Sequence, residues 1–166
     1  MARSLNCEKG PTPTPCGQCQ SCTDLVANGP GSIDVIELDA ATHGLVDDAR
    51  DLRDKAFFAP VQSKYKIYII DEAHQLGPGA ANALLKVVEE PPAHVIFIFA
   101  TTEPEKLIST IRSRTHHYPF RLVPPGILGT HLEKVCESEG VKVAKGVIPL
   151  VVRASGGSVR DALSVL

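Results

Sequence analysis

The chain lacks long apolar segments and any large excess of one charge. No apolar run reaches the roughly 18 residues that a membrane-spanning helix needs, and the first ten residues, MARSLNCEKG, contain no apolar core of a signal peptide. The formal net charge of -2 gives no overall attraction to nucleic acid or anionic lipid. These absences argue against a membrane partner and predict a cytoplasmic protein that would meet DNA through a local patch or through other subunits.

Aromatic residues are also scarce, and one common nucleotide-binding motif is absent. Aromatic residues make up only 5% of the chain, which argues against a single-strand nucleic-acid binder, because such proteins stack bases on aromatic side chains. No G-x-x-x-x-G-K-[ST] motif occurs, so the chain lacks the loop that holds nucleotide phosphates in many ATPases. In contrast, 43% hydrophobic and 22% charged residues are normal for a globular protein.

Four of the five cysteines lie in the first 31 residues, in the pattern C-x8-C-x2-C-x2-C, at Cys7, Cys16, Cys19 and Cys22. Two-residue gaps let neighbouring thiolates converge on one ion, and four sulfurs complete the tetrahedral shell of a structural zinc site. An iron–sulfur cluster usually has its fourth cysteine downstream and followed by proline, and unliganded thiols are the other alternative. The pattern favours zinc. The fifth cysteine, Cys136, lies in an amphipathic stretch and is expected to be buried.

Short apolar runs alternate with amphipathic stretches from residue 32 to about 120. The runs predict strands over residues 33–38, 67–70, 95–99 and 116–120, and the periodicity predicts helices over residues 45–56, 78–90 and 104–113. This alternation predicts an α/β fold with a parallel, doubly wound sheet. Beyond a Pro-Pro-Gly boundary at residues 124–126, only helices are expected, over residues 128–139, 144–154 and 159–166, with Ser158 as the N-cap of the last.

Two adjacent acids, Asp71 and Glu72, follow the apolar run at residues 67–70. In an open α/β sheet, ligands bind beyond the carboxyl ends of the strands. A buried strand that ends in two acids is typical of a Walker B segment, in which the first acid helps hold Mg²⁺ and the second orients the attacking water. A solvated acidic turn is the alternative, and this segment alone does not decide between the two.

Several segments together resemble one family, the tau/gamma subunits of bacterial DNA polymerase III, which are the ATPases of the sliding-clamp loader in the AAA+ superfamily. In chain order they are NCEKG…PCGQCQSC, IELDAATHGLVDDARDL, IIDEAHQL, NALLKVVEEPP, FATTEPEKL, TIRSR and GGSVRDALS. The resemblance covers nearly the whole chain. It implies a clamp-loader ATPase that uses ATP and Mg²⁺ to place a ring-shaped clamp on primed DNA.

The resemblance also implies a role for individual residues. Asp71 and Glu72 would be the Walker B pair, Thr102 the sensor 1 hydroxyl that faces the γ-phosphate or the catalytic water, and Arg114 the arginine finger for a neighbouring subunit's ATP. Arg160 would be the sensor 2 arginine of the lid, and Cys7, Cys16, Cys19 and Cys22 the ligands of the family's zinc module. The alternatives are that Thr102 caps a helix and that Arg160 is a surface charge.

Other residues are interpreted as structural. Arg112, close to Arg114, is expected to be a surface charge. His74 completes a DEAH sequence, but no other helicase motif accompanies it, so we interpret it as local structure. His116 and His117 would face opposite sides of a short strand, where they could not share a metal.

The resemblance implies two domains. Residues 1–122 would be a partial AAA+ nucleotide-binding domain with the zinc module at 7–22, and residues 123–166 would begin a helical lid domain. The sequence is expected to start inside the helix that follows the phosphate loop, without the central strand before that loop. We therefore expect this polypeptide by itself to bind ATP weakly or not at all, to be inactive as an ATPase and to be prone to aggregation.

The expected partners are the other clamp-loader subunits, further copies of the chain, the sliding clamp, the polymerase III core and primed DNA. Two other functions remain open. One is a non-catalytic, structural relative of the clamp-loader ATPase, against which the intact Asp71–Glu72 pair and Arg160 argue. The other is a zinc-binding adaptor for nucleic acid, against which the near-neutral charge argues.

Overall fold

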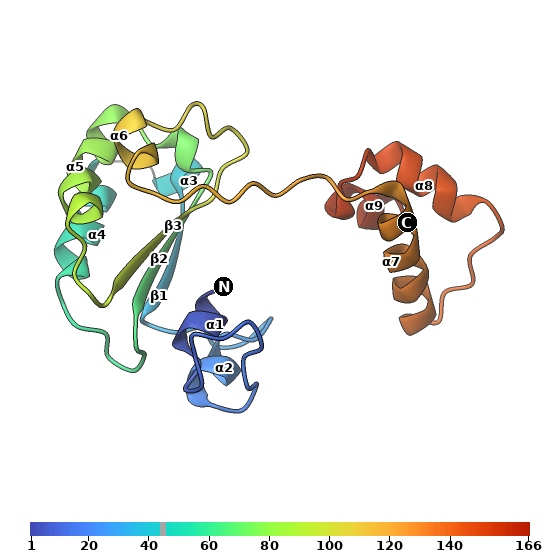
Figure 1. The fold of residues 1–166 in the computed structure, drawn as a ribbon, viewed down its shortest axis with the longest axis horizontal. Helices are drawn as coiled ribbons and strands as arrows, with labels where there is room; N and C mark the ends of the chain where they lie inside the picture. The colour runs from blue at the N-terminus through green and yellow to red at the C-terminus, as the bar shows by residue number, and fades with distance from the viewer. Residues whose placement is uncertain (44–45) are drawn as a thin grey trace. The chain divides into compact units, whose positions relative to one another are not determined.

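The computed structural model describes residues 1–43 and 46–166 (Figure 1). The chain divides into two compact units, Met1–His117 and Tyr118–Leu166, which are considered separately. Within the described residues, all the strands belong to the first unit, and the second unit is helical. No helix in the described part of the chain is both long and apolar enough to cross a membrane.

A parallel sheet forms the centre of the first unit. Its three strands, in the order β1-β2-β3, are β1 (Val35–Asp39), β2 (Lys66–Asp71) and β3 (Val95–Phe99). Ile67 of β2 lies opposite Val35 on one side and Ile96 on the other. The central strand β2 is almost wholly buried until its last residue, as expected for a run of β-branched and aromatic side chains in a parallel sheet. The α/β prediction is confirmed.

Two helices cover one face of this sheet. These are α4 (Val46–Ala56) and α5 (Pro78–Glu89), and their apolar faces share one core with the side chains of β1, β2 and β3 that point the same way (Figure 1). Within this core, Tyr68 stacks on Phe97 with ring centroids 5.4 Å apart. A doubly wound sheet has helices on both of its faces. Because α4 and α5 both lie on one face, these two helices do not give the arrangement that was predicted. The predicted start of α4, Leu45, lies outside the described residues.

Two predictions near the end of the first unit are wrong. Residues 116–120 form no strand, and Phe120 is 92% exposed. The boundary between the two units falls inside this segment, so the segment connects the units and does not pair with a neighbouring strand, which any strand requires. The helix predicted over 104–113 shrinks to α6 (Ser109–Arg112), because Ile108 has an extended backbone (φ -56°, ψ 137°) that separates α6 from the turn at 104–106.

The cysteine-rich segment is attached to the start of β2. It contains two short helices, α1 (Ala2–Asn6) and α2 (Gln20–Asp24), the second of which the sequence pattern did not predict. The buried Asn6 side chain donates to the carbonyl of Tyr65 at 3.0 Å and accepts from the Tyr65 N–H at 2.9 Å. This paired contact ties α1 to the residue just before β2.

Three helices make up the second unit. They are α7 (Pro125–Ser138), α8 (Val147–Ser155) and α9 (Val159–Val165), packed around Leu128, Leu132, Val151 and Ala162. The Ser158 hydroxyl accepts from the Asp161 N–H at 3.2 Å, so the predicted N-cap is confirmed. Pro149 is the third residue of α8, where a missing N–H breaks no intrahelical hydrogen bond.

Candidate metal centre and nucleotide site

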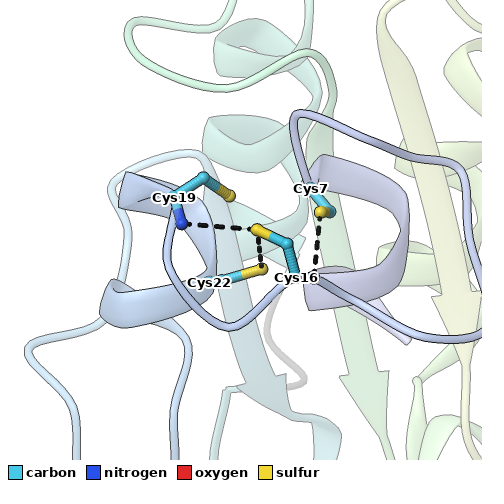
Figure 2. Close-up of side chains that lie close together, drawn as sticks. All are labelled: Cys7, Cys16, Cys19 and Cys22. Carbon is cyan, nitrogen blue, oxygen red and sulfur yellow. Dashed lines mark hydrogen bonds between the residues drawn. The ribbon is translucent and has the colours of Figure 1, made fainter.

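The four clustered cysteines converge on one point. Cys7 is the C-cap of α1 and Cys19 the N-cap of α2, Cys22 lies within α2, and Cys16 comes from the loop between these helices (Figure 2). All four Sγ atoms lie within 4.8 Å of one another, and those of Cys16 and Cys22 are 3.9 Å apart. Four thiolates bound at about 2.3 Å to one tetrahedral ion lie about 3.8 Å from each other. The arrangement therefore fits a single metal ion.

Backbone N–H groups support the sulfurs as they would support thiolates. The Cys16 N–H donates to Sγ of Cys7 and the Cys19 N–H donates to Sγ of Cys16, each at 3.4 Å. Donation from the backbone of Gln18, and then of Cys19, lowers the pKa of Cys16 to about 6, whereas burial raises the pKa of Cys22. A donor set of four cysteines, three of them buried, can hold a structural metal.

Within the described chain, this cluster is the one group of three or more His, Cys, Asp or Glu side chains whose ligand atoms all lie within 4.8 Å of one another. Because residues 116–120 form no strand, the expectation that His116 and His117 face opposite sides of one is wrong. Neither histidine belongs to a metal-binding group in residues 1–43 and 46–166. Cys136 is buried in α7, as the sequence predicts.

The two acids lie where β2 ends. Asp71 is the last residue of β2 and is exposed, and its Oδ1 accepts from the Glu72 N–H at 2.9 Å. Glu72 adopts a left-handed conformation (φ 47°, ψ 41°) before the short helix η1 (Ala73–Gln75). Non-glycine residues rarely take this conformation, and residues held in such sparsely populated conformations cluster at functional sites.

His74 links this turn to the end of β3. Its Nδ1 lies 2.8 Å from Oγ1 of Thr101 and 3.4 Å from a carboxylate oxygen of Glu72, and its Nε2 lies 3.5 Å from Oε1 of Glu103. The Ala73 N–H also donates to the carbonyl of Ala100 at 2.9 Å. The ends of the two strands are therefore connected both by the imidazole ring of His74 and by the backbone.

Sequence reasoning missed the partners in this cluster, Thr101 and Glu103. The predicted sensor, Thr102, is exposed and follows directly after Thr101. A hydrogen bond from Lys106, together with the charges of Lys106 and the nearby His74, lowers the pKa of Glu103. The ATTEP sequence contains two hydroxyls, and spacing alone could not indicate which of them would meet His74.

The three candidate arginines differ in their surroundings. Arg114 pairs with Glu89 of α5 at 2.9 Å, whereas Arg112 has a longer contact, 3.5 Å, to the carbonyl of Glu105. Arg160 is exposed in the first turn of α9. Asp71, Glu72, Thr102 and Arg114 lie in the first unit and Arg160 in the second.

Two family models match the chain. Residues 1–124 match a model described as DNA polymerase III, delta subunit. Residues 128–166 match a model described as DNA polymerase III clamp loader subunit, ATPase lid domain. The boundary between the matches falls close to the Pro-Pro-Gly sequence at 124–126.

Individual relatives share this similarity along the whole chain. The chain is 66% identical over 166 residues to the DNA polymerase III subunit gamma/tau of Mycobacterium tuberculosis, and 46% identical over 166 residues to the subunit tau of Bacillus subtilis. Each match covers 100% of the chain but only 29% of the relative. The chain is also 42% identical over 165 residues to the subunit tau of Escherichia coli, and it spans 25% of that protein.

Solved structures have a similar fold. A DNA polymerase III gamma subunit-related protein of Thermotoga maritima matches with a TM-score of 0.60 and 26% identity, over 80% of this chain and 41% of that one. The RuvB Holliday junction branch migration motor of the same species matches with a TM-score of 0.65 over 81% of this chain and 44% of its own. At 16% identity, the second match supports the fold alone.

Proposed function

Because this chain belongs to the family of DNA polymerase III clamp-loader subunits, with gamma/tau subunits among its relatives, we propose that it forms part of a clamp-loader ATPase. In this role it would couple ATP binding and hydrolysis to placing a sliding clamp on primed DNA. The observation that carries the proposal is the Asp71–Glu72 pair at the end of β2, joined through His74 to the end of β3. This is the edge of a parallel sheet at which ligands bind.

Each candidate residue has a chemical role in this proposal. Asp71 helps hold Mg²⁺, and Glu72 orients the attacking water. Thr102 acts as sensor 1, and its exposed hydroxyl is free to face a phosphate. Arg114 supplies positive charge to the ATP of a neighbouring subunit, and Arg160 acts as sensor 2. Residues 1–122 then form the nucleotide-binding domain and residues 123–166 the lid.

Zinc is the metal that we propose for the cysteine cluster. Four sulfur ligands at this spacing form a closed site of the kind that structural zinc takes. Cys7, Cys16, Cys19 and Cys22 would hold the ion, which would stabilise a segment with little apolar core of its own. The ion lies outside the proposed chemistry.

The proposed partners follow from the same role. They are other clamp-loader subunits, further copies of the chain, the sliding clamp, the polymerase III core and primed DNA, and the place of action is the bacterial cytoplasm, where the chromosome is replicated. The phosphate loop that this chemistry needs does not occur in the 166 residues, and the chain spans only 29% of its gamma/tau relatives. ATP hydrolysis is therefore proposed for a full-length protein that carries these residues.

A non-catalytic structural subunit is the second candidate. Residues 1–124 match a model that is named for the delta subunit, a different subunit from gamma/tau, whereas the 66% identity to a gamma/tau subunit and the intact acid pair favour the ATPase. The third candidate, a zinc-binding adaptor, accounts for the cysteine cluster but not for the lid match over 128–166.

The experiment that tests the proposal places this sequence in a full-length protein. The 166 residues replace the matching segment of the Mycobacterium tuberculosis gamma/tau subunit, and the clamp loader is assembled with its other subunits. We expect Arg114→Ala to lower kcat for clamp- and DNA-stimulated ATP hydrolysis by about 10³-fold or more, the usual effect of an arginine finger. Glu72→Gln should also abolish turnover.

Arg112→Ala is the matched control, because Arg112 lies two residues away but lacks the contact to Glu89. This control should keep nearly full activity. An assembly that hydrolyses ATP equally well with Arg114→Ala and with the parent sequence would overturn the proposed role of Arg114. Full activity with Glu72→Gln would favour the structural subunit.

A further inference from the structure

Arg114 is held by a carboxylate from a different helix. Its Nη2 lies 2.9 Å from Oε1 of Glu89, the last residue of α5. Its Nη1 donates to the carbonyl of Thr110 at 3.0 Å and lies 3.3 Å from Oγ of Ser113. The guanidinium is therefore clamped between the end of α5 and its own turn after α6.

The position of Glu89 is unfavourable for a carboxylate by itself. The last residue of α5 lies where the helix dipole disfavours negative charge. Arg114 offsets this cost by bringing a cation to the same helix end. The two side chains are 40% and 41% exposed, and such an exposed pair adds little to the stability of a fold. Its main consequence is the direction that it gives to the arginine.

The clamp leaves part of the guanidinium available. The contacts to Glu89, Thr110 and Ser113 use at most three of its five N–H groups. Ile111, one turn before Arg114, is fully buried in the core that α5 shares, so the backbone that carries the arginine is fixed. The remaining N–H groups of a fixed, partly exposed guanidinium suit an anionic ligand on another molecule.

We propose that Glu89 is a positioning residue for Arg114. It restricts the rotamers of the arginine so that the N–H groups left over face the phosphates bound by a neighbouring subunit. A positioned cation loses less side-chain freedom when it meets the transition state, which raises kcat without changing the affinity for ATP. This inference rests on the proposed function of Arg114.

The test uses a clamp loader assembled from two forms of the full-length chimeric subunit. The donor form carries Glu72→Gln, so its own site is inactive, and it keeps Arg114. The recipient form carries Arg114→Ala and keeps Glu72. Neither form should hydrolyse ATP when assembled without the other, and the mixture should recover activity at the recipient's site with the donor's arginine.

Glu89→Gln is then placed in one form at a time. In the donor it should lower kcat of the mixture by about two- to five-fold, the size expected for losing one exposed ion pair, and leave KM for ATP unchanged. In the recipient, which has no Arg114, the same substitution should have no effect. Glu90→Gln in the donor is the matched control, because Glu90 is the exposed neighbour of Glu89.

The outcomes distinguish the positioning role of Glu89 from the trans-acting role of Arg114. In one outcome, the mixture recovers ATPase activity and then loses the same share of kcat whether Glu89→Gln is in the donor or in the recipient. That result shows a general structural effect of the substitution. It overturns the positioning role of Glu89 and leaves the arginine-finger role of Arg114 intact. Recovery with no loss from Glu89→Gln in the donor overturns that role as well. A mixture that never recovers activity overturns the trans-acting arginine and, with it, this inference.

Discussion

Asp34 is a buried carboxylate that organises the loop before β2. Its two carboxylate oxygens accept from the N–H groups of Val61, Gln62 and Ser63 at 2.7–2.8 Å. Burial by itself would raise the pKa of Asp34, but the three N–H donors outweigh it and the pKa lies below its usual value. The folded state therefore favours the ionised form.

We expect Asp34→Asn to lower the free energy of unfolding of the first unit by about 2–3 kcal/mol at pH 7, because an amide cannot accept all three charge-assisted hydrogen bonds. A depressed pKa stabilises the fold above the unfolded pKa, and this contribution is lost as the pH falls through the folded pKa. Stability should thus decline below about pH 4 in the parent and decline less in the variant. Urea denaturation followed by circular dichroism measures both effects.

Asp51→Asn provides the control for this prediction. Asp51 lies in α4, is largely exposed and has only a 4.0 Å contact to Lys55, so its replacement should change stability little. Equal stability of Asp34→Asn and the parent at pH 7 would contradict the role assigned to Asp34.

At the scale of elements, the cysteine-rich segment depends on its metal. Helices α1 and α2 have only five residues each, and helices of this length are not stable by themselves in water. Their buried centre consists of cysteine side chains. The segment is therefore expected to fold around an ion, as small metal-binding modules do.

We expect the purified chain to contain one zinc ion and Cys19→Ser to lose it, because the serine hydroxyl is a far weaker ligand for zinc than a thiolate. Metal content is measured by elemental analysis. Cys136→Ser is the control, since Cys136 lies in α7 of the second unit and more than 100 residues after the cluster in the sequence. Zinc retained fully by Cys19→Ser, or iron found in place of zinc, would contradict the assignment.

At the scale of the whole molecule, nucleotide binding needs more than the residues assigned here. In the proposed function, the acids, the sensor and the arginines would meet the γ-phosphate and the metal, whereas the phosphates themselves are held in such ATPases by the backbone of a glycine-rich loop. That motif does not occur in these 166 residues.

We therefore expect the 166-residue chain to show no saturable binding of a fluorescent ATP analogue in the presence of Mg²⁺. Equilibrium titration followed by fluorescence anisotropy measures this, and the full-length chimera serves as the control that binds. Tight, stoichiometric binding by the 166-residue chain would mean that another loop holds the phosphates.

Local patterns alone determined much of this protein. Short apolar runs predict the three strands, and the spacing of four cysteines predicts the candidate metal site. A single serine beside its helix predicts the N-cap of α9. Each depends on residues that are near one another in the chain, and therefore the sequence predicts it.

Tertiary structure decided which distant residues meet. The sequence did not indicate that Asp34 would accept from residues 61–63, that His74 would meet Thr101, or that Glu89 would hold Arg114. It also predicted a strand at 116–120, where no strand forms. A strand and a side-chain hydrogen bond both require a partner at a set distance in space, and only the folded chain fixes that distance.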